Sequence, residues 1–445
     1  MTQERKAFPE QLDDFLLAHL DHIALVPLAL YLATPLVDLA VVVANGYVSF
    51  TSRQVYHTVV ETLAYPMGAY FAALLGLAVA WLAARGLLRT SRERLAVLAP
   101  LGALLALAVV STLANPEDPY RISGIGPSYV GIGSYLLFVC AYLWPASVVR
   151  EGRLRRAACM ALCAESVPVG VHALWLAATY GGLPGTGASA RPEGVFYNSN
   201  HYGYFLAMVV ALYAALWALG EGRRLRLLAL ATLSFNAFVL MRNDTLGAWV
   251  ACVSALVALC AFCLAARRGC LRRALAAAAL FVLVTVAVGA WDGSMVRSVA
   301  GLPADVSAVA TGSQTAPRAG SGRWRLWVAT AKLIAQRPWL GWGAEGICDA
   351  LYATCGLERA HCEPLMYAAY FGVPALCCYL AGCAAAFACA WRRRRALGAT
   401  EVACLVAALA YLVSSCFGNM YFYTTPFFFM LLGLGLRPPE VGARA

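Results

Sequence analysis

Charge is scarce in this chain. Charged residues make up 13% of its 445 residues and hydrophobic residues 61%, with a mean hydropathy of +0.69. Soluble domains carry about 25% charged residues, so an ordinary soluble domain is excluded. Apolar runs of about 20 residues, such as 95–114, instead indicate helices that span a membrane. The runs are continuous and do not alternate with polar residues, which excludes membrane-spanning strands.

Metal-site motifs are also missing. The sequence has no His-Glu-x-x-His motif and no Asp-x-Asp pair, and most of its 16 cysteines lie inside apolar runs, where they act as small apolar side chains. We therefore expect neither a metal nor a cofactor. Only Cys348, Cys355 and Cys362 fall in a segment outside the apolar runs, and both a Cys348–Cys355 bridge and free thiols fit the sequence.

Positive charge is in excess, with 34 Lys and Arg against 23 Asp and Glu. These residues lie in short loops between apolar runs and form no basic soluble face, which excludes a nucleic-acid partner. Alternate loops carry most of them, as in 85–94, 150–156, 267–273 and 392–395. The positive-inside rule therefore predicts an even number of spans with both termini cytoplasmic. Residues 1–14 lack the layout of a signal peptide and are expected to form a cytoplasmic tail.

The sequence predicts an all-α, polytopic protein of the cytoplasmic membrane with about twelve transmembrane helices and one large extracytoplasmic loop carrying short helices. We expect an N-terminal transmembrane bundle at 1–290, the loop at 291–363, and the last helices with a cytoplasmic tail at 364–445. The expected spans are 23–44, 64–84, 95–114, 129–149, 157–180, 199–220, 225–241, 245–266, 272–290, 364–390, 402–418 and 422–436.

The large loop divides into two parts. Residues 292–322 are small and polar and are expected to be mobile. In 323–337 the apolar residues recur with the spacing of an amphipathic helix, which Pro338 should end. A second short helix is expected at 347–357. This loop helix could lie on the membrane surface or against the bundle.

His361 is the first candidate catalytic residue. It lies at the water–bilayer boundary, where the chain is expected to re-enter the membrane. An imidazole there can be neutral near pH 7 and accept a proton. Arg359 and Glu363 flank it and are candidate substrate-binding residues. The alternative is an ordinary surface histidine at the start of a helix.

Arginines form the second candidate group. Arg323 and Arg325 stand at the start of the loop helix, and guanidinium groups bind phosphate oxygens through paired donors. Ordinary charge on an amphipathic helix is the alternative. Arg242 begins a short polar turn with Asn243 and Asp244 between two spans. Such a turn either faces a water-filled cavity or is a plain tight turn.

A third candidate group stands at the start of the sixth expected span. Asn198, Asn200 and His201 lie there among aromatic residues. Two amides and an imidazole at a membrane interface could bind a sugar or a lipid headgroup. Aromatic residues are common at this depth, so an ordinary aromatic belt is the alternative.

Several motifs occur in a suggestive order: Phe196-Tyr197-Asn198-Ser199-Asn200-His201, then Gly322-Arg323 with Trp327, then Pro338-Trp339-Leu340-Gly341-Trp342-Gly343, and last Ala360-His361-Cys362-Glu363 with Gly372-Val373-Pro374. In their order and spacing they resemble motifs of the O-antigen ligase and Wzy polymerase superfamily, which are bacterial membrane glycosyltransferases. A run from Tyr120 and Arg121 to Gly131 is similar to that family too. The resemblance covers about residues 100–436.

The resemblance implies an enzyme that takes a glycan from undecaprenyl diphosphate and attaches it to a hydroxyl of an acceptor glycan, lipid or protein. It implies that the family's essential histidine is His361 and its loop arginine Arg323, and it makes Arg121 a substrate-binding candidate. The family's other arginine is Leu246 in this chain, and we expect Arg242, one turn earlier, to substitute. Cys362 is a second departure, since the family has asparagine there.

Together these residues predict a metal-independent, inverting glycosyl transfer. His361 would accept the proton of the attacking hydroxyl, and Arg323 and Arg242, with Arg325, would bind the diphosphate. Two other interpretations stay open. A transporter or flippase for a polysaccharide or lipid would need buried charges along a path through the membrane. A non-catalytic component of an envelope-glycan assembly complex would need none of these side chains.

Overall fold

A computed structural model describes most of the chain. It covers residues 29–44, 65–85, 92–117, 120–124, 130–147, 152–181, 190–196 and 198–436, together with the pairs 10–11, 14–15 and 18–19. Within these residues every regular element is helical and none is a strand. The expected all-α class is therefore confirmed for the part of the chain that is described.

The helices follow one another with short connections. The first half contains α2 (Thr34–Ala44), α4 (Tyr65–Ala84), α5 (Arg92–Ala114), α6 (Ile132–Ser147), α7 (Gly152–Tyr180), η2 (Gly194–Phe196), α8 (Ser199–Leu219) and α9 (Arg223–Asn243). The second half contains α10 (Leu246–Ala266), η3 (Arg268–Cys270), α11 (Leu271–Trp291), α12 (Ser294–Thr311), η4 (Ala316–Arg318), α13 (Arg323–Gln336), α14 (Cys348–Cys355), α15 (Glu363–Phe371), α16 (Val373–Arg392), α17 (Ala399–Ser415) and α18 (Thr425–Gly435).

Among the described residues, 7 helices are long and apolar enough to cross a membrane. Five shorter apolar helices occupy the positions of the other expected spans: Thr34–Ala44, Ala72–Trp81, Ile132–Ala146, Ala399–Ser415 and Thr425–Gly435. These apolar helices indicate a multi-pass membrane protein. The count of about twelve spans stays a prediction.

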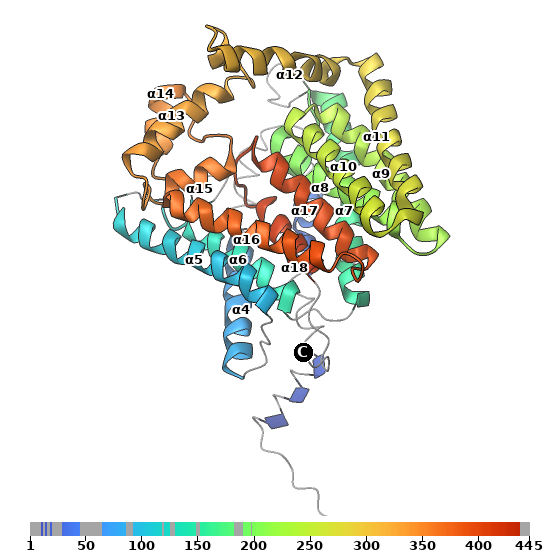
Figure 1. Cartoon of the computed structure of the whole chain (residues 1–445), viewed down its shortest axis with the longest axis horizontal. Helices are drawn as coiled ribbons and strands as arrows, with labels where there is room; N and C mark the ends of the chain where they lie inside the picture. The colour runs from blue at the N-terminus through green and yellow to red at the C-terminus, as the bar shows by residue number, and fades with distance from the viewer. Residues whose placement is uncertain are drawn as a thin grey trace, which may run out of the picture.

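Helix α8 is the centre of the bundle. It packs against α9, α10, α11 and α17, and nearly all of its side chains are buried (Figure 1). A helix that is apolar on every side is stable only when other helices surround it. Its N-terminus is capped by the Asn198 side chain, which accepts hydrogen bonds from the backbone N–H groups of Asn200 (2.9 Å) and His201 (3.3 Å).

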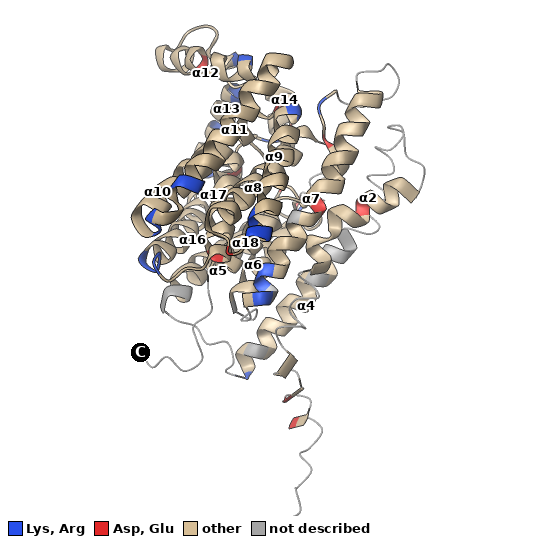
Figure 2. Ribbon diagram, turned by 90° about the vertical axis from the view of Figure 1, so that its right-hand side faces the viewer, with Lys and Arg blue, Asp and Glu red and all other residues tan. Residues whose placement is uncertain are grey.

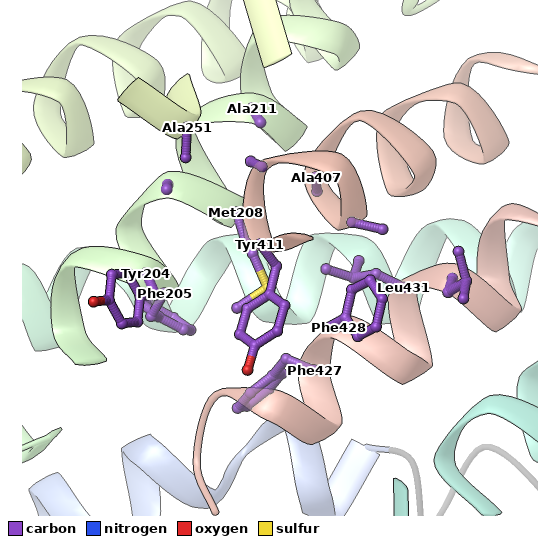
Figure 3. Close-up of a cluster of buried hydrophobic side chains, with 14 of the residues drawn as sticks. Tyr204, Phe205, Met208, Ala211, Ala251, Ala407, Tyr411, Phe427, Phe428 and Leu431 are labelled. Carbon is purple, nitrogen blue, oxygen red and sulfur yellow. The ribbon is translucent and has the colours of Figure 1, made fainter. Parts of the chain in front are cut away.

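Aromatic side chains fill the space between α8, α17 and α18. Figure 3 shows Phe205 and Met208 of α8 beside Tyr411 of α17 and the phenylalanines of α18. The rings of Tyr411 and Phe428 stack with centroids 5.0 Å apart. This core fixes the outer end of α8 relative to the loop that joins α17 and α18.

Two expectations were wrong in detail. Residues 294–311, expected within a mobile segment, form α12, which continues to η4 through a turn at Gly312. The expected span 364–390 is not one helix, because the chain turns at Gly372 (φ 88°) between α15 and α16. In both cases the sequence pattern is weak and contacts made elsewhere in the fold decide the structure. The expected helices at 323–337 and 347–357 are confirmed as α13 and α14.

The break at Gly372 is where the outer helices join the bundle. Gly343 N–H donates to Tyr370 O (2.8 Å), and Val373 N–H donates to Pro338 O (2.8 Å). A side chain at Gly372 would overlap the backbone of Trp339, so glycine is required at this crossing. The turn after α13 is therefore held against the end of α15, and α12–α14 lie over one end of the bundle (Figure 1).

Candidate functional site

His361 lies just before α15 and is held by the loop that joins α17 to α18. Its backbone N–H donates to Oδ1 of Asn419 (2.8 Å), and Nδ2 of Asn419 lies 3.4 Å from Nδ1 of the ring. Because Oδ1 accepts the backbone proton, the amide nitrogen faces the ring as a donor. The ring proton then rests on Nε2, and Nδ1 holds the basic lone pair. His361 also has φ 50°, a conformation that side chains rarely adopt.

The same loop contacts the outer end of α8. The rings of His201 and Tyr421 stack with centroids 4.1 Å apart, and the Tyr204 hydroxyl donates to Phe417 O (2.8 Å). An added Cβ at Gly418 would clash with the Tyr204 ring. The loop between α17 and α18 therefore connects His201 on α8 with His361, two residues 160 positions apart in the printed numbering.

Arg323 brings a positive charge to this place. It is half-buried at the start of α13, where α13 packs against α15 and the Trp327 ring lies 6.5 Å from the ring of Phe417. Burial lowers the pKa of His361 to about 4, and the charges of Arg323 and Arg359 act in the same direction. The imidazole is therefore neutral and lies in the field of a guanidinium group.

Arg191 is a site residue that sequence reasoning missed. Its guanidinium donates to Asn243 O (2.8 Å), Asp244 O (2.6 Å) and Oγ1 of Thr245 (3.0 Å), so it holds the turn between α9 and α10. Burial lowers the pKa of Arg191, which the acidic neighbours oppose and the charge of Arg323 reinforces. A second arginine thus lies close enough to Arg323 for their charges to interact. An arginine next to Pro192, just before an expected span, was the available signal.

Arg359 points into the protein. It pairs with Glu345, with Nη2 3.0 Å from Oε2, and Glu345 also accepts from Tyr370 (3.1 Å) and Cys348 (3.0 Å). Burial would lower the pKa of Arg359, but the Glu345 carboxylate outweighs it and the pKa is raised. This ion pair fixes the chain just before His361, and it is a structural role that the expected substrate contact did not foresee.

Truncation of this pair is expected to destabilise the protein. Arg359→Ala would leave the fully buried Glu345 carboxylate without its counter-charge, which costs about 3–5 kcal/mol. Thermal unfolding in detergent should show a clear fall in melting temperature. The double variant Arg359→Ala with Glu345→Gln should recover part of the loss, because it removes the buried charge. An Arg359→Ala melting temperature equal to that of the parent would contradict the structural role.

Two of the expected arginines lie elsewhere. Arg242 pairs with Asp292 and stacks over the Trp291 ring at 5.0 Å, at the junction of α9 and the end of α11. Arg325 donates from Nη2 to Cys355 O (2.8 Å) and lines a cavity between α13 and α14. The interactions described for His361 therefore involve Arg323 and Arg359, and the substitution of Arg242 for the arginine absent at Leu246 stays a prediction.

The other expected residues have various surroundings. The Asn198 side chain caps α8, and Asn200 is partly exposed in its first turn. The Glu363 carboxylate is buried and accepts from Tyr411 (2.7 Å) and Tyr379 (3.3 Å), which joins α15 to α16 and α17. Arg121 lies in the turn between α5 and α6, where its carbonyl accepts from Ile132 N–H (2.9 Å).

Cysteine and metal chemistry add nothing to the site as described. Cys348 and Cys355 are both free thiols, so the bridge considered above does not form. Among the described residues no group of three or more His, Cys, Asp and Glu side chains could hold a metal ion. The side chains around His361 are instead hydroxyls, amides and guanidinium groups.

Residues 231–380 match the family model described as O-Antigen ligase (Wzy_C). The match runs from α9 to α16 and includes Arg242, Arg323 and His361. No curated protein matches the chain. His201 and Asn419, which contact the site from α8 and from the α17–α18 loop, lie outside the matched residues.

Proposed function

We propose that this chain, which carries a domain of the O-antigen ligase family in residues 231–380, transfers a glycan from an undecaprenyl diphosphate carrier to an acceptor hydroxyl. The reaction would take place at the outer face of the cytoplasmic membrane, with both termini on the opposite side. One observation carries the proposal: a neutral imidazole, His361, stands in the field of the half-buried Arg323 at the end of an apolar helix bundle.

His361 would act as the general base. As the acceptor hydroxyl oxygen attacks the anomeric carbon, its proton passes to Nδ1 of the imidazole, in place of the long contact with Asn419. The bond between the anomeric carbon and the diphosphate oxygen breaks, and its electron pair leaves with the diphosphate. A single displacement of this kind inverts the configuration at the anomeric carbon.

Arg323 would stabilise the leaving group. Negative charge grows on the diphosphate as the bond breaks, and a guanidinium group presents paired donors to such oxygens. In other glycosyl transfers a divalent cation provides this charge. Here the diphosphate would also offset the repulsion between Arg323 and the imidazolium that forms at His361. Arg191, whose charge interacts with that of Arg323, would contribute to the same positive field.

Purified protein provides the direct test. It would be incubated with undecaprenyl diphosphate-linked oligosaccharide and with candidate glycan, lipid and peptide acceptors, with and without EDTA, and the products identified by mass. We expect a glycosylated acceptor, free undecaprenyl diphosphate and no effect of EDTA. Movement of the lipid-linked glycan across liposomes, with no transfer to any acceptor, would overturn the proposal and indicate a flippase.

The pH dependence of His361 gives an independent prediction. With a pKa lowered to about 4, the ring should stay neutral as the pH falls from neutral through the ordinary value of 6.5. Arg323→Gln removes a positive charge that disfavours the imidazolium, so the pKa of His361 is expected to rise toward that ordinary value. Histidine NMR titrations in nanodiscs would measure it, with the His361 signal assigned by its loss in His361→Asn. Arg318→Gln is the control, and an unchanged or lower pKa in Arg323→Gln would contradict the proximity of the two side chains.

A further inference from the structure

A second cavity lies on the outer helices, away from His361. It has a volume of about 540 Å³ and is formed by η4, α13 and α14. Its polar lining comes from Ser313, Trp324, Arg325, Lys332, Gln336 and Thr354. Small-molecule sites typically have volumes of about 300–1,000 Å³, so this cavity can hold a ligand of several rings.

Helix α13 separates this cavity from the proposed catalytic site. Arg323 and Trp327 lie on the side of α13 that meets His361 and the α17–α18 loop. Arg325 and Lys332 stand seven positions apart, which places them two turns apart on one face of the helix. The alternation of Arg323 and Arg325 therefore directs one guanidinium group to each side of the same helix.

The charge of the cavity selects an anion. Arg325 is held in the wall because its Nη2 donates to Cys355 O at the end of α14 (2.8 Å), and Lys332 is exposed farther along α13. No carboxylate is among the residues that line the cavity. Two cations without a neighbouring acid favour a phosphate or carboxylate group.

The remaining lining favours a sugar. Trp324 offers a flat apolar ring with a polar edge, and its edge-on contact with Trp327 at 6.3 Å fixes its orientation. Hydroxyl and amide groups of Ser313, Thr354 and Gln336 can exchange hydrogen bonds with sugar hydroxyls. A lipid headgroup would use the cations but would leave these groups without a role.

We infer that this cavity binds an anionic saccharide, meaning a sugar that carries a carboxylate or a phosphate. Its place in the reaction rests on the proposed glycan transfer, because a site across α13 from His361 would hold a glycan while its end reaches the catalytic side chains. Both the acceptor and the distal part of the donor glycan could supply such a group. Kinetics can tell the two sources apart.

Direct binding tests the inference without using catalysis. Tetragalacturonate is the anionic probe and maltotetraose the neutral one, titrated by calorimetry into the full chain in phosphatidylcholine nanodiscs. We expect tetragalacturonate to bind and Lys332→Gln and Trp324→Ala each to weaken it by about tenfold. Arg318→Gln, which removes an exposed cation outside the cavity, should have no effect. Equal binding of both probes, absence of binding, or equal loss in Arg318→Gln would overturn the inference.

Transfer assays then assign the source. If the acceptor occupies the cavity, Lys332→Gln should raise KM for an anionic acceptor and leave KM for the donor unchanged; the reverse result would assign the donor glycan. If the tetragalacturonate probe fails to bind while phosphatidylglycerol alone stimulates transfer through Lys332, the cavity is a lipid site and the inference fails. Failure of the transfer proposal would appear separately, as full activity in His361 variants.

Discussion

Replacement of His361 by alanine is expected to lower the rate of glycan transfer by about 10²–10⁴-fold, the usual contribution of a general base. Alanine cannot accept the proton of the attacking hydroxyl, and no other group contacts the Asn419 amide in the same way. Expression and membrane insertion should be unchanged, since His361 belongs to no described membrane helix. Transfer would be followed by mass spectrometry of the acceptor.

The backbone at His361 requires a second variant. Its φ of 50° is disfavoured for alanine, so loss of activity in His361→Ala could reflect a shifted loop. Asparagine tolerates this conformation but cannot act as a base, and His361→Asn should be equally inactive. His172→Gln, which changes a histidine on α7 beside Trp175, is the matched control and should keep activity. Near-parental transfer by His361→Asn would remove this residue from the mechanism.

The sequence was sufficient where local pattern decides the structure. Apolar spacing predicted α13 and Pro338 its end, and both are confirmed. Helix α12 was missed because its small residues carry little periodic signal and include Gly301 and Pro303. A tertiary contact supports that region, since Gly320 N–H donates to Asp305 Oδ2 (2.9 Å). Such a contact exists only after the chain has folded.

The site shows the same division. His361 and Arg323 stand in recognisable motifs, whereas Asn419 lies 58 residues after the histidine whose orientation it fixes. Arg191 is 52 residues from the turn it holds. Arg242 was expected to help bind the diphosphate because Asp292, its partner, returns to it only through the packing of α9 against α11. Distant pairings of this kind leave no mark in a single sequence.

Arg323→Ala is expected to reduce transfer by about 10²–10³-fold, the loss typical when a donor to a developing anion is removed. The side chain is half-buried beside a neutral imidazole, so no solvent-exposed cation can replace it at that position. If Arg323 stabilises the leaving diphosphate, the loss should appear mainly in kcat. Donors with better leaving groups than the diphosphate should be less affected than the natural one.

Lysine at position 323 tests the geometry as distinct from the charge. Arg323→Lys keeps a positive charge but presents a single ammonium group, which cannot form the two parallel hydrogen bonds of a guanidinium. We therefore expect Arg323→Lys to fall between Arg323→Ala and the parent, and to stay at least about tenfold impaired. Arg318→Lys, on the neighbouring η4, is the matched control and should retain full transfer. Parental activity in Arg323→Lys would mean that positive charge alone is needed, and parental activity in Arg323→Ala would exclude the residue from leaving-group stabilisation.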